Sequence, residues 1–364
     1  MKKILSFIIT YFLISISVFA NIEEVLPSQK GIVKAIEYVD LEDSNDIKQI
    51  VEIKLLNGNS KGEVIYVDNM LSGNSYYDIK LKKGTNVILH VEKLNDSIIY
   101  SIENIQRSHA LLILSVLFCG LLIYVGRKKG VYSLLSIAIT CVLITNFLSP
   151  MILAGIDPII STIIICVLST AITMYLVGGF NRKSSSATIG CILSLVFAGI
   201  LALFTTKVAS LTGFNSEESM FLYTAHPELN FVAIAISTII LATMGAVMDV
   251  AMSIASTINE IYTIDNSKTI KELFTSGMNV GRDIIGTMAN TLILVYLGAS
   301  LPLLLLASNI DLQKFFNLNQ VATEISSALI GSIAIVICVP ITAFIASSLI
   351  KNTAKKIEFP TIQE

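Results

Sequence analysis

The sequence has 364 residues, of which 54% are hydrophobic and only 14% charged, whereas about 25% of residues are charged in soluble globular chains. The formal net charge of -2 argues against a nucleic-acid partner, which would favour a clearly basic protein. Charged residues are frequent up to Arg107, and long apolar runs fill the chain from His109 to Ile350. We therefore expect an integral membrane protein whose second part has a lipid bilayer as its partner.

The first twenty residues have the pattern of an export signal. Lys2 and Lys3 precede an apolar run from Ile4 to Phe19, and Val18-Phe19-Ala20 places small residues where a signal peptidase cleaves. An uncleaved anchor helix is the alternative to a signal peptide over residues 1–20, although the apolar run is shorter than the ~20 residues that a span prefers. In both cases residues 21–108 are expected outside the membrane, as an extracytoplasmic domain.

Residues 21–108 have strand periodicity. Apolar and charged residues alternate in Val51–Leu55, and Val87, Leu89 and Val91 alternate with Ile88, His90 and Glu92, which places one face inward and one toward water. His90 is a lone histidine outside any catalytic cluster, so we expect a binding or docking module. Five or six short strands in so few residues predict a small all-β barrel-like domain of the OB or SH3-like kind. The remaining strands fit residues 32–39, 63–67, 76–81 and 98–102, separated by glycine-containing turns.

Seven apolar segments follow, each long enough or nearly long enough to cross a bilayer. Basic residues cluster after the first, third, fifth and seventh segments, and loops rich in lysine and arginine face the cytoplasm. The prediction is an α-helical polytopic membrane bundle over residues 109–350, with the N-terminal domain outside and a cytoplasmic tail over residues 351–364. The segments lie near residues 109–126, 131–149, 158–180, 186–207, 230–256, 284–306 and 325–350.

Local signals predict where several helices begin or bend. Asp157 followed by Pro158 suits the start of the third apolar helix, and Asn215-Ser216-Glu217-Glu218 suits a helix start in an outer loop. Pro302 and Pro340 lie inside the sixth and seventh segments and are expected to bend them. Apolar positions of residues 270–278 share one helical face, which predicts a short helix, either on the membrane surface or packed under the bundle.

A line of polar residues crosses the fifth apolar segment. Asp249, Ser253, Ser256 and Glu260 stand at i, i+4, i+7 and i+11, which aligns them on one helical face. Asp249 lies about seven residues, or ~10 Å, from the predicted cytoplasmic end of that helix. An acid at that depth costs about 2.5 to 3.5 kcal/mol on insertion scales, so it needs a partner, a proton or a water-filled cavity.

The sixth segment offers groups that match this face. Arg282 and Asp283 lie at its cytoplasmic mouth, and Thr287 and Asn290 follow at helical spacing. Counted from the same membrane face, Asn290 reaches nearly the depth of Asp249, which allows a hydrogen bond or a shared ion site. Arg282 is placed to pair with Glu260 near the interface. Because intramembrane acids are usually functional, these eight residues form a candidate polar pathway. The alternative is that they hold the bundle together and do nothing else.

These same segments carry a family resemblance. The runs Gly245–Ser256 and Gly281–Thr291, the latter continuing to Leu305, resemble the characteristic blocks of the YibE/F-like bacterial membrane proteins. The outer run Asn69–Gly84 resembles that family too, and the likeness covers most of the chain after residue 30. The resemblance implies a polytopic protein of the bacterial inner (plasma) membrane. It implies no catalytic residue.

Two functions fit these features. In the first, the protein is a secondary transporter or exporter of a small solute or ion, with Asp249 as the group that carries a proton or cation. The missing internal repeat speaks against it, and no Walker motif supports direct ATP coupling. In the second, the protein is a membrane scaffold or assembly factor whose outer β domain docks an extracytoplasmic protein partner.

An enzyme is not expected. Asp249 and Asp283 are at different depths and therefore do not suit an intramembrane aspartyl protease. The histidines His90, His109 and His226 are scattered and form no metal-ligand motif. We accordingly expect no cofactor and no bound metal.

Overall fold

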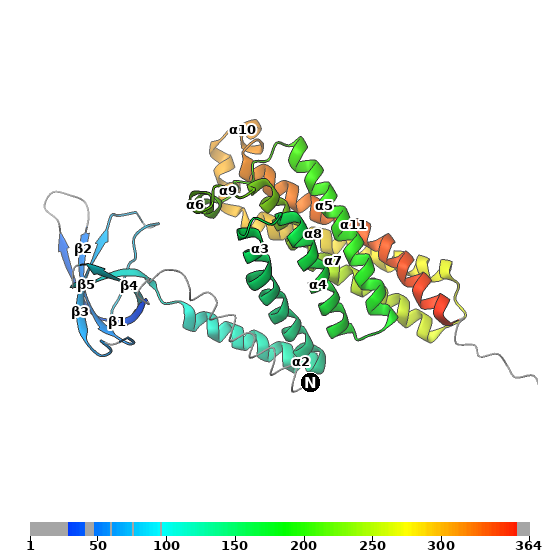
Figure 1. Ribbon diagram of the computed structural model, residues 1–364, viewed down its shortest axis with the longest axis horizontal. Coiled ribbons are helices and arrows are strands. Elements are labelled where there is room, and N and C mark those ends of the chain that lie inside the picture. Colours follow the sequence, from blue (N-terminus) through cyan, green and yellow to red (C-terminus); the bar gives the residue numbers. More distant parts are fainter. Residues whose placement is uncertain (1–27, 41–46, 59, 75, 95–96, 355–364) are drawn as a thin grey trace, which may run out of the picture. The chain divides into compact units, whose positions relative to one another are not determined.

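The computed structural model describes residues 28–40, 47–58, 60–74, 76–94 and 97–354. The expected signal segment, residues 1–20, and most of the expected tail, residues 351–364, lie outside the described residues. The chain divides into two compact units, Met1–Leu122 and Ile123–Glu364. The first contains a β-sheet and the second a helical bundle (Figure 1).

The sheet has five antiparallel strands in the order β3-β2-β1-β4-β5. The edge strands β3 and β5 also contact each other, so the sheet curls into a nearly closed barrel. This closure protects strand edges that would otherwise pair with other chains. The predicted all-β barrel-like domain is therefore confirmed. The strands are β1 (Gln29–Asp40), β2 (Ile47–Leu55), β3 (Val64–Leu71), β4 (Asn86–Leu94) and β5 (Ser97–Ile105).

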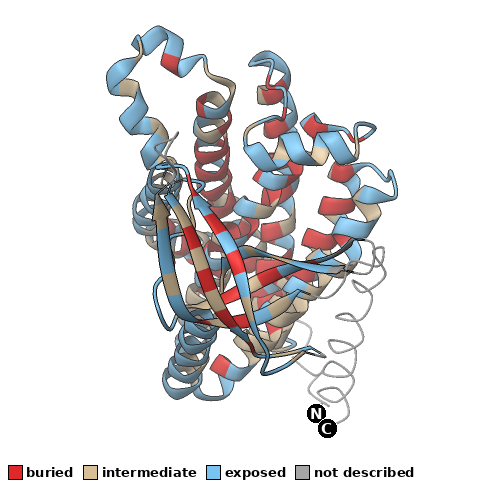
Figure 2. Cartoon of the chain, turned by 90° about the vertical axis from the view of Figure 1, so that its left-hand side faces the viewer, coloured by how far each residue is buried: buried red, intermediate tan, exposed pale blue. Residues whose placement is uncertain are grey.

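The strand alternation read from the sequence sets the inside of the barrel. Val51, Ile53 and Leu55 of β2 are at most 1% exposed, and the residues between them are not buried (Figure 2). His90 lies on the outer side of β4, as expected. One polar pair is enclosed with the apolar residues. The Asn69 Nδ2 donates to the Gln49 Oε1 at 2.8 Å and also to the Ile79 carbonyl.

The expected strand over residues 76–81 is wrong. This segment follows β3 as a turn, because the Asp78 carboxylate accepts hydrogen bonds from the Ser72 backbone N–H at 2.7 Å and from its hydroxyl at 3.0 Å. Gly73 enters this turn at φ +79°, a conformation that glycine adopts readily. Desolvation raises the pKa of the Asp78 carboxyl, but the hydrogen bonds from Ser72 and Gly73 outweigh it and leave that pKa lowered. Leu81 still closes the barrel core, at 2% exposed.

Six helical runs in the described residues are long and apolar enough to cross a membrane, and the chain is a membrane protein. The first run, Ser108–Leu153, is 46 residues long and includes the two segments predicted at 109–126 and 131–149. Its helix α2 (Ser108–Leu143) is broken at Arg127, where φ is 49° and ψ is -127°. The π-helix η1 (Ile144–Leu148) and α3 (Ser149–Leu153) complete the run.

The remaining spans overlap the predicted segments, but α8 begins fourteen residues before the predicted 284–306 and ends seven residues before its predicted end. They are α4 (Pro158–Gly178), α5 (Arg182–Val208), α7 (Phe231–Ile264), α8 (Ile270–Ala299) and α11 (Asn319–Ala354). Short helices connect them outside these spans, namely α6 (Glu217–Ala225), α9 (Leu301–Leu306), the 3₁₀ turn η2 (Ala307–Asn309) and α10 (Leu312–Phe316).

Several helix ends form as the sequence indicates, and two do not. Asp157 caps α4 by accepting from the Ile159 and Ile160 backbone N–H groups, and α6 begins at Glu217. The separate short helix expected over residues 270–278 is wrong, because these residues form the first turns of α8, which a capping box opens. Pro302 does not bend a continuous helix. The α8 helix ends at Ala299, and Pro302 is the second residue of α9, which begins at Leu301.

The core of the helical unit lies where α5, α7, α8 and α11 meet (Figure 1). Helix α11 packs along the other three. Glycines allow these close approaches. A Cβ added at Gly190 of α5 would overlap the Thr342 hydroxyl of α11, and one at Gly331 of α11 would come within 2.5 Å of Leu292 of α8. Gly190 thus allows the close approach of α5 to α11, and Gly331 that of α11 to α8.

Candidate functional site

Helix α7 has one buried side and one open side. Val247, Val250 and Ile254, at helical spacing, are fully buried against the neighbouring helices. Asp249 follows Val247 by two residues, which turns it about 200° away around the helix axis. It is exposed at the surface of the unit. The buried side of α7 therefore holds the bundle together, and the acid lies on the side that does not.

The four predicted residues of α7 share this open side. Asp249, Ser253 and Glu260 are exposed, and Ser256 is half-buried. Gly245, one turn before Asp249, has no atom within 4 Å of the place a Cβ would occupy. Together these five positions form what we call the α7 polar face. It runs for about 22 Å along the helix. It extends from the middle of α7 to the end that the basic loops predict to be cytoplasmic.

Helix α8 approaches the bundle through its glycines. A Cβ added at Gly277 would come within 2.7 Å of Ile258 of α7, and one at Gly281 would overlap Val339 of α11. Asn290 follows Gly281 by nine residues, so it points about 180° away from this contact. Gly277 and Gly281 thus lie on the packed side of α8, and Asn290 is on the opposite side.

The four predicted residues of α8 are all exposed. They are Arg282, Asp283, Thr287 and Asn290. The Thr287 hydroxyl donates to the Ile284 carbonyl at 3.1 Å, within its own helix. The polar residues of α8 are therefore as open as those of α7.

The pairings expected between the two helices do not form among the described residues. Arg282 donates to the Asn279 Oδ1 at 2.9 Å, one turn away on α8, and no ion pair joins it to Glu260. The Asp249 carboxylate accepts no hydrogen bond from Asn290 or from any other described group. The structure thus aligns each set of polar residues on its own helix without joining the sets to each other.

An exposed acid inside an apolar span limits what can surround it. Facing lipid, Asp249 costs about 2.5 to 3.5 kcal/mol, and Glu260 near the helix end costs less because its side chain reaches the interface. Ser253 and Ser256 are hydroxyl donors and acceptors, suited to water or a bound cation. Among the described residues, no three histidine, cysteine or acidic side chains come together as metal ligands. This face therefore presents carboxylate and hydroxyl oxygens along one side of α7.

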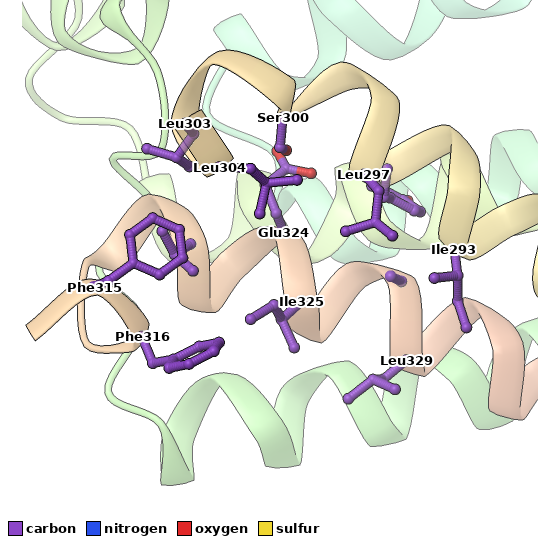
Figure 3. Close-up of a pocket in the computed structure, with 13 residues that line it drawn as sticks. Ile293, Leu297, Ser300, Leu303, Leu304, Phe315, Phe316, Glu324, Ile325 and Leu329 are labelled. Atoms are coloured by element: carbon purple, nitrogen blue, oxygen red, sulfur yellow. The ribbon is translucent and has the colours of Figure 1, made fainter. Parts of the chain in front are cut away.

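Another acid within the spans was missed by the sequence reasoning. Glu324 is the sixth residue of α11, and it lines an apolar cavity with Tyr296 and Ser300 (Figure 3). The signal was present, since an acid close to an apolar run is costly there. It was overlooked because the predicted helix began at residue 325, one position later.

Comparisons with known proteins agree on the family. The family model described as YibE/F-like protein matches residues 114–352, and that described as YibE/F family N-terminal domain matches residues 28–105. The two matches cover the helical spans and the β domain respectively. No curated protein and no solved structure matches the chain.

Proposed function

This chain belongs to the YibE/F-like family, and on that premise we propose that it is a secondary transporter of the bacterial cell membrane. In this proposal the α7 polar face lines the path of a proton or small cation. Asp249 is the group that binds the ion, and Ser253 and Ser256 supply oxygen atoms along the path. The N-terminal domain is extracytoplasmic and the C-terminus cytoplasmic, as the basic loops indicate.

One observation carries the proposal. Asp249 is exposed and accepts no hydrogen bond from the described residues, in the middle of a 34-residue helix that is long and apolar enough to cross a membrane. A residue kept only to hold helices together would contact another helix, as the Thr243 hydroxyl and Gly331 do. A carboxylate open to its surroundings at that depth favours contact with water and exchange of ions.

Ion exchange in proteoliposomes tests this proposal. Vesicles containing the purified full-length protein carry an imposed proton gradient, and Na⁺, K⁺ or Mg²⁺ is added outside in turn while a pH-sensitive dye reports the lumen. We expect at least one cation to dissipate the gradient through the wild type, and Asp249→Asn to abolish that response. Glu228→Gln, a change at an exposed acid of the outer loop, should leave it intact. A wild type that exchanges none of the three cations would contradict the proposal.

A scaffold role is the second candidate, because the β domain exposes apolar side chains on one strand. Val64, Tyr66 and Met70 of β3 are 47%, 72% and 54% exposed, and they alternate along the strand on its outer side. An edge strand with such a surface suits an extracytoplasmic protein partner. The test is Tyr66→Glu in the full-length protein. A partner that co-purifies with the wild type and with Asp249→Asn, but not with Tyr66→Glu, would favour the scaffold over the transporter.

A further inference from the structure

An apolar cavity of about 210 Å³ lies between the end of α8 and the start of α11. Helices α9 and α10 cover its sides, so it is built by four elements of the same unit (Figure 3). Phe315 and Phe316 of α10 lie at one end, with ring centroids 5.6 Å apart. Ile293 of α8 and Leu329 of α11 lie at the other end. The cavity is separate from the α7 polar face.

Glu324 is the one acidic residue of this cavity lining. Its side chain is half-buried, and none of the described residues gives its carboxylate a hydrogen bond or an ion pair. From Asp283 to Ile350 the sequence contains a single basic residue, Lys314, and it forms no ion pair in the described structure. A charge enclosed by apolar side chains without a counter-ion is unfavourable. The cavity lining therefore contains one acidic side chain that has no hydrogen-bond or ion-pair partner among the described residues.

The dipole of helix α11 does not explain why an acid is found at position 324. The dipole of a helix favours acids within its first turn, and Glu324 is the sixth residue of α11, beyond that turn. A purely structural acid at this place would also be expected to bond with Ser300 or Tyr296, which line the same space. Neither bond forms.

We propose that this cavity binds a small amphipathic organic cation, an ammonium group attached to a compact apolar body, with Glu324 as the counter-ion. The apolar body fits the aliphatic wall, and the positive group pairs with the carboxylate. The aromatic rings of Tyr296, Phe315 and Phe316 add the faces over which cations bind favourably. The combination of an apolar enclosure with few convergent polar groups is typical of small-molecule sites. This inference does not depend on the transport proposal.

Equilibrium dialysis of the detergent-purified full-length protein against radiolabelled benzyltrimethylammonium tests the site. We expect saturable binding to the wild type, at least about tenfold weaker binding to Glu324→Gln, and near-wild-type binding to Glu324→Asp, since a charge-assisted contact is worth about a tenfold change or more. Neopentylbenzene, which has the same shape and no charge, should compete weakly and should not distinguish the wild type from Glu324→Gln. Wild-type protein that binds no more probe than Glu324→Gln would overturn the proposal.

Two further variants separate the site from the stability of the fold. Ala328→Leu keeps the charge and places a larger side chain on the cavity wall, because Ala328 lines the cavity and is 8% exposed. We expect it to weaken probe binding as Glu324→Gln does. Glu218→Gln, at an exposed acid of α6, should bind like the wild type. Equal loss in Glu218→Gln would show a non-specific charge effect and contradict the proposal.

A membrane lipid is the other source of an ammonium group. The same measurement in nanodiscs made with and without phosphatidylethanolamine distinguishes it from a soluble ligand. If the probe binds equally in both, the small-cation assignment holds. If phosphatidylethanolamine displaces the probe completely and in a Glu324-dependent manner, the site belongs to the lipid headgroup and the assignment made here is wrong.

Discussion

Two glycines of the same helix give the sharpest test of how α8 packs. At Gly281 an added Cβ would overlap one methyl of Val339 and lie 3.4 Å from its other side-chain atoms, and Val339 is fully buried and unable to retreat. At Gly286 nothing lies within 4 Å. We therefore expect Gly281→Ala to destabilise the protein relative to Gly286→Ala by about 1–3 kcal/mol, the usual cost of overpacking a core. The gain in helix propensity, about 1 kcal/mol, is common to both changes and cancels in the comparison.

Buried thiols provide the assay for this comparison. Cys166, Cys191 and Cys338 are at most 1% exposed and become reactive when the bundle unfolds. Cys119 and Cys141 are more accessible and are replaced by alanine in all samples. A thiol-reactive fluorophore then reports the midpoint of thermal unfolding in detergent. Gly286→Ala should melt at or above the parent and Gly281→Ala below it. Equal midpoints, or a lower one for Gly286→Ala, would refute the packing of α8 described above.

Three further outcomes are expected. Arg127→Gly should stabilise the protein by about 1 kcal/mol or more in the same thermal assay, because φ 49° and ψ -127° strain a residue with a Cβ. In the β domain, Asn69→Ala leaves the buried Gln49 amide unsatisfied and should lower the free energy of unfolding by about 1–3 kcal/mol, as measured by denaturant titration. The lowered pKa of Asp78 stabilises the fold at a pH above its ordinary value of 3.8, and this contribution is lost as the pH falls through the folded pKa. Asp78→Asn should therefore flatten the acid limb of a plot of stability against pH, whereas an unchanged limb would exclude Asp78 as its origin.

Much of the fold follows from patterns that are local in the sequence. The alternation in Val51–Leu55 sets which face of β2 is buried, because the period of two is a property of any strand. The cap at Asp157 depends on one side chain and two neighbouring N–H groups. Both predictions are confirmed. The strand expected at residues 76–81 failed because a carboxylate six residues from Ser72 formed a turn in place of a ladder.

Local patterns in the sequence predict only part of the candidate site. Helical spacing alone placed Asp249, Ser253 and Glu260 on one side of α7. Which side of α8 faces α7 depends on Gly277 and Gly281, and their contacts with Ile258 and Val339 join segments far apart in the sequence. The alignment of the polar residues along α7 was therefore predictable, whereas the rotation of α8 about its own axis was not. Glu324 was overlooked because the predicted helix began one residue later, and the cavity that it lines is assembled from four separate helices.

The accessibility of position 249 tests the central claim most directly, namely that the α7 polar face is in contact with water inside the membrane. Asp249→Cys, Ala255→Cys and Val196→Cys are compared in membrane vesicles, on a background without other reactive cysteines, using a water-soluble thiol reagent that does not cross lipid. Ala255 is fully buried, and Val196 is 39% exposed on α5 about as far from its helix end as Asp249 is from the end of α7. The account predicts that Asp249→Cys is modified and that the other two are not. Modification of Asp249→Cys no faster than Val196→Cys would place this face against lipid and contradict the account.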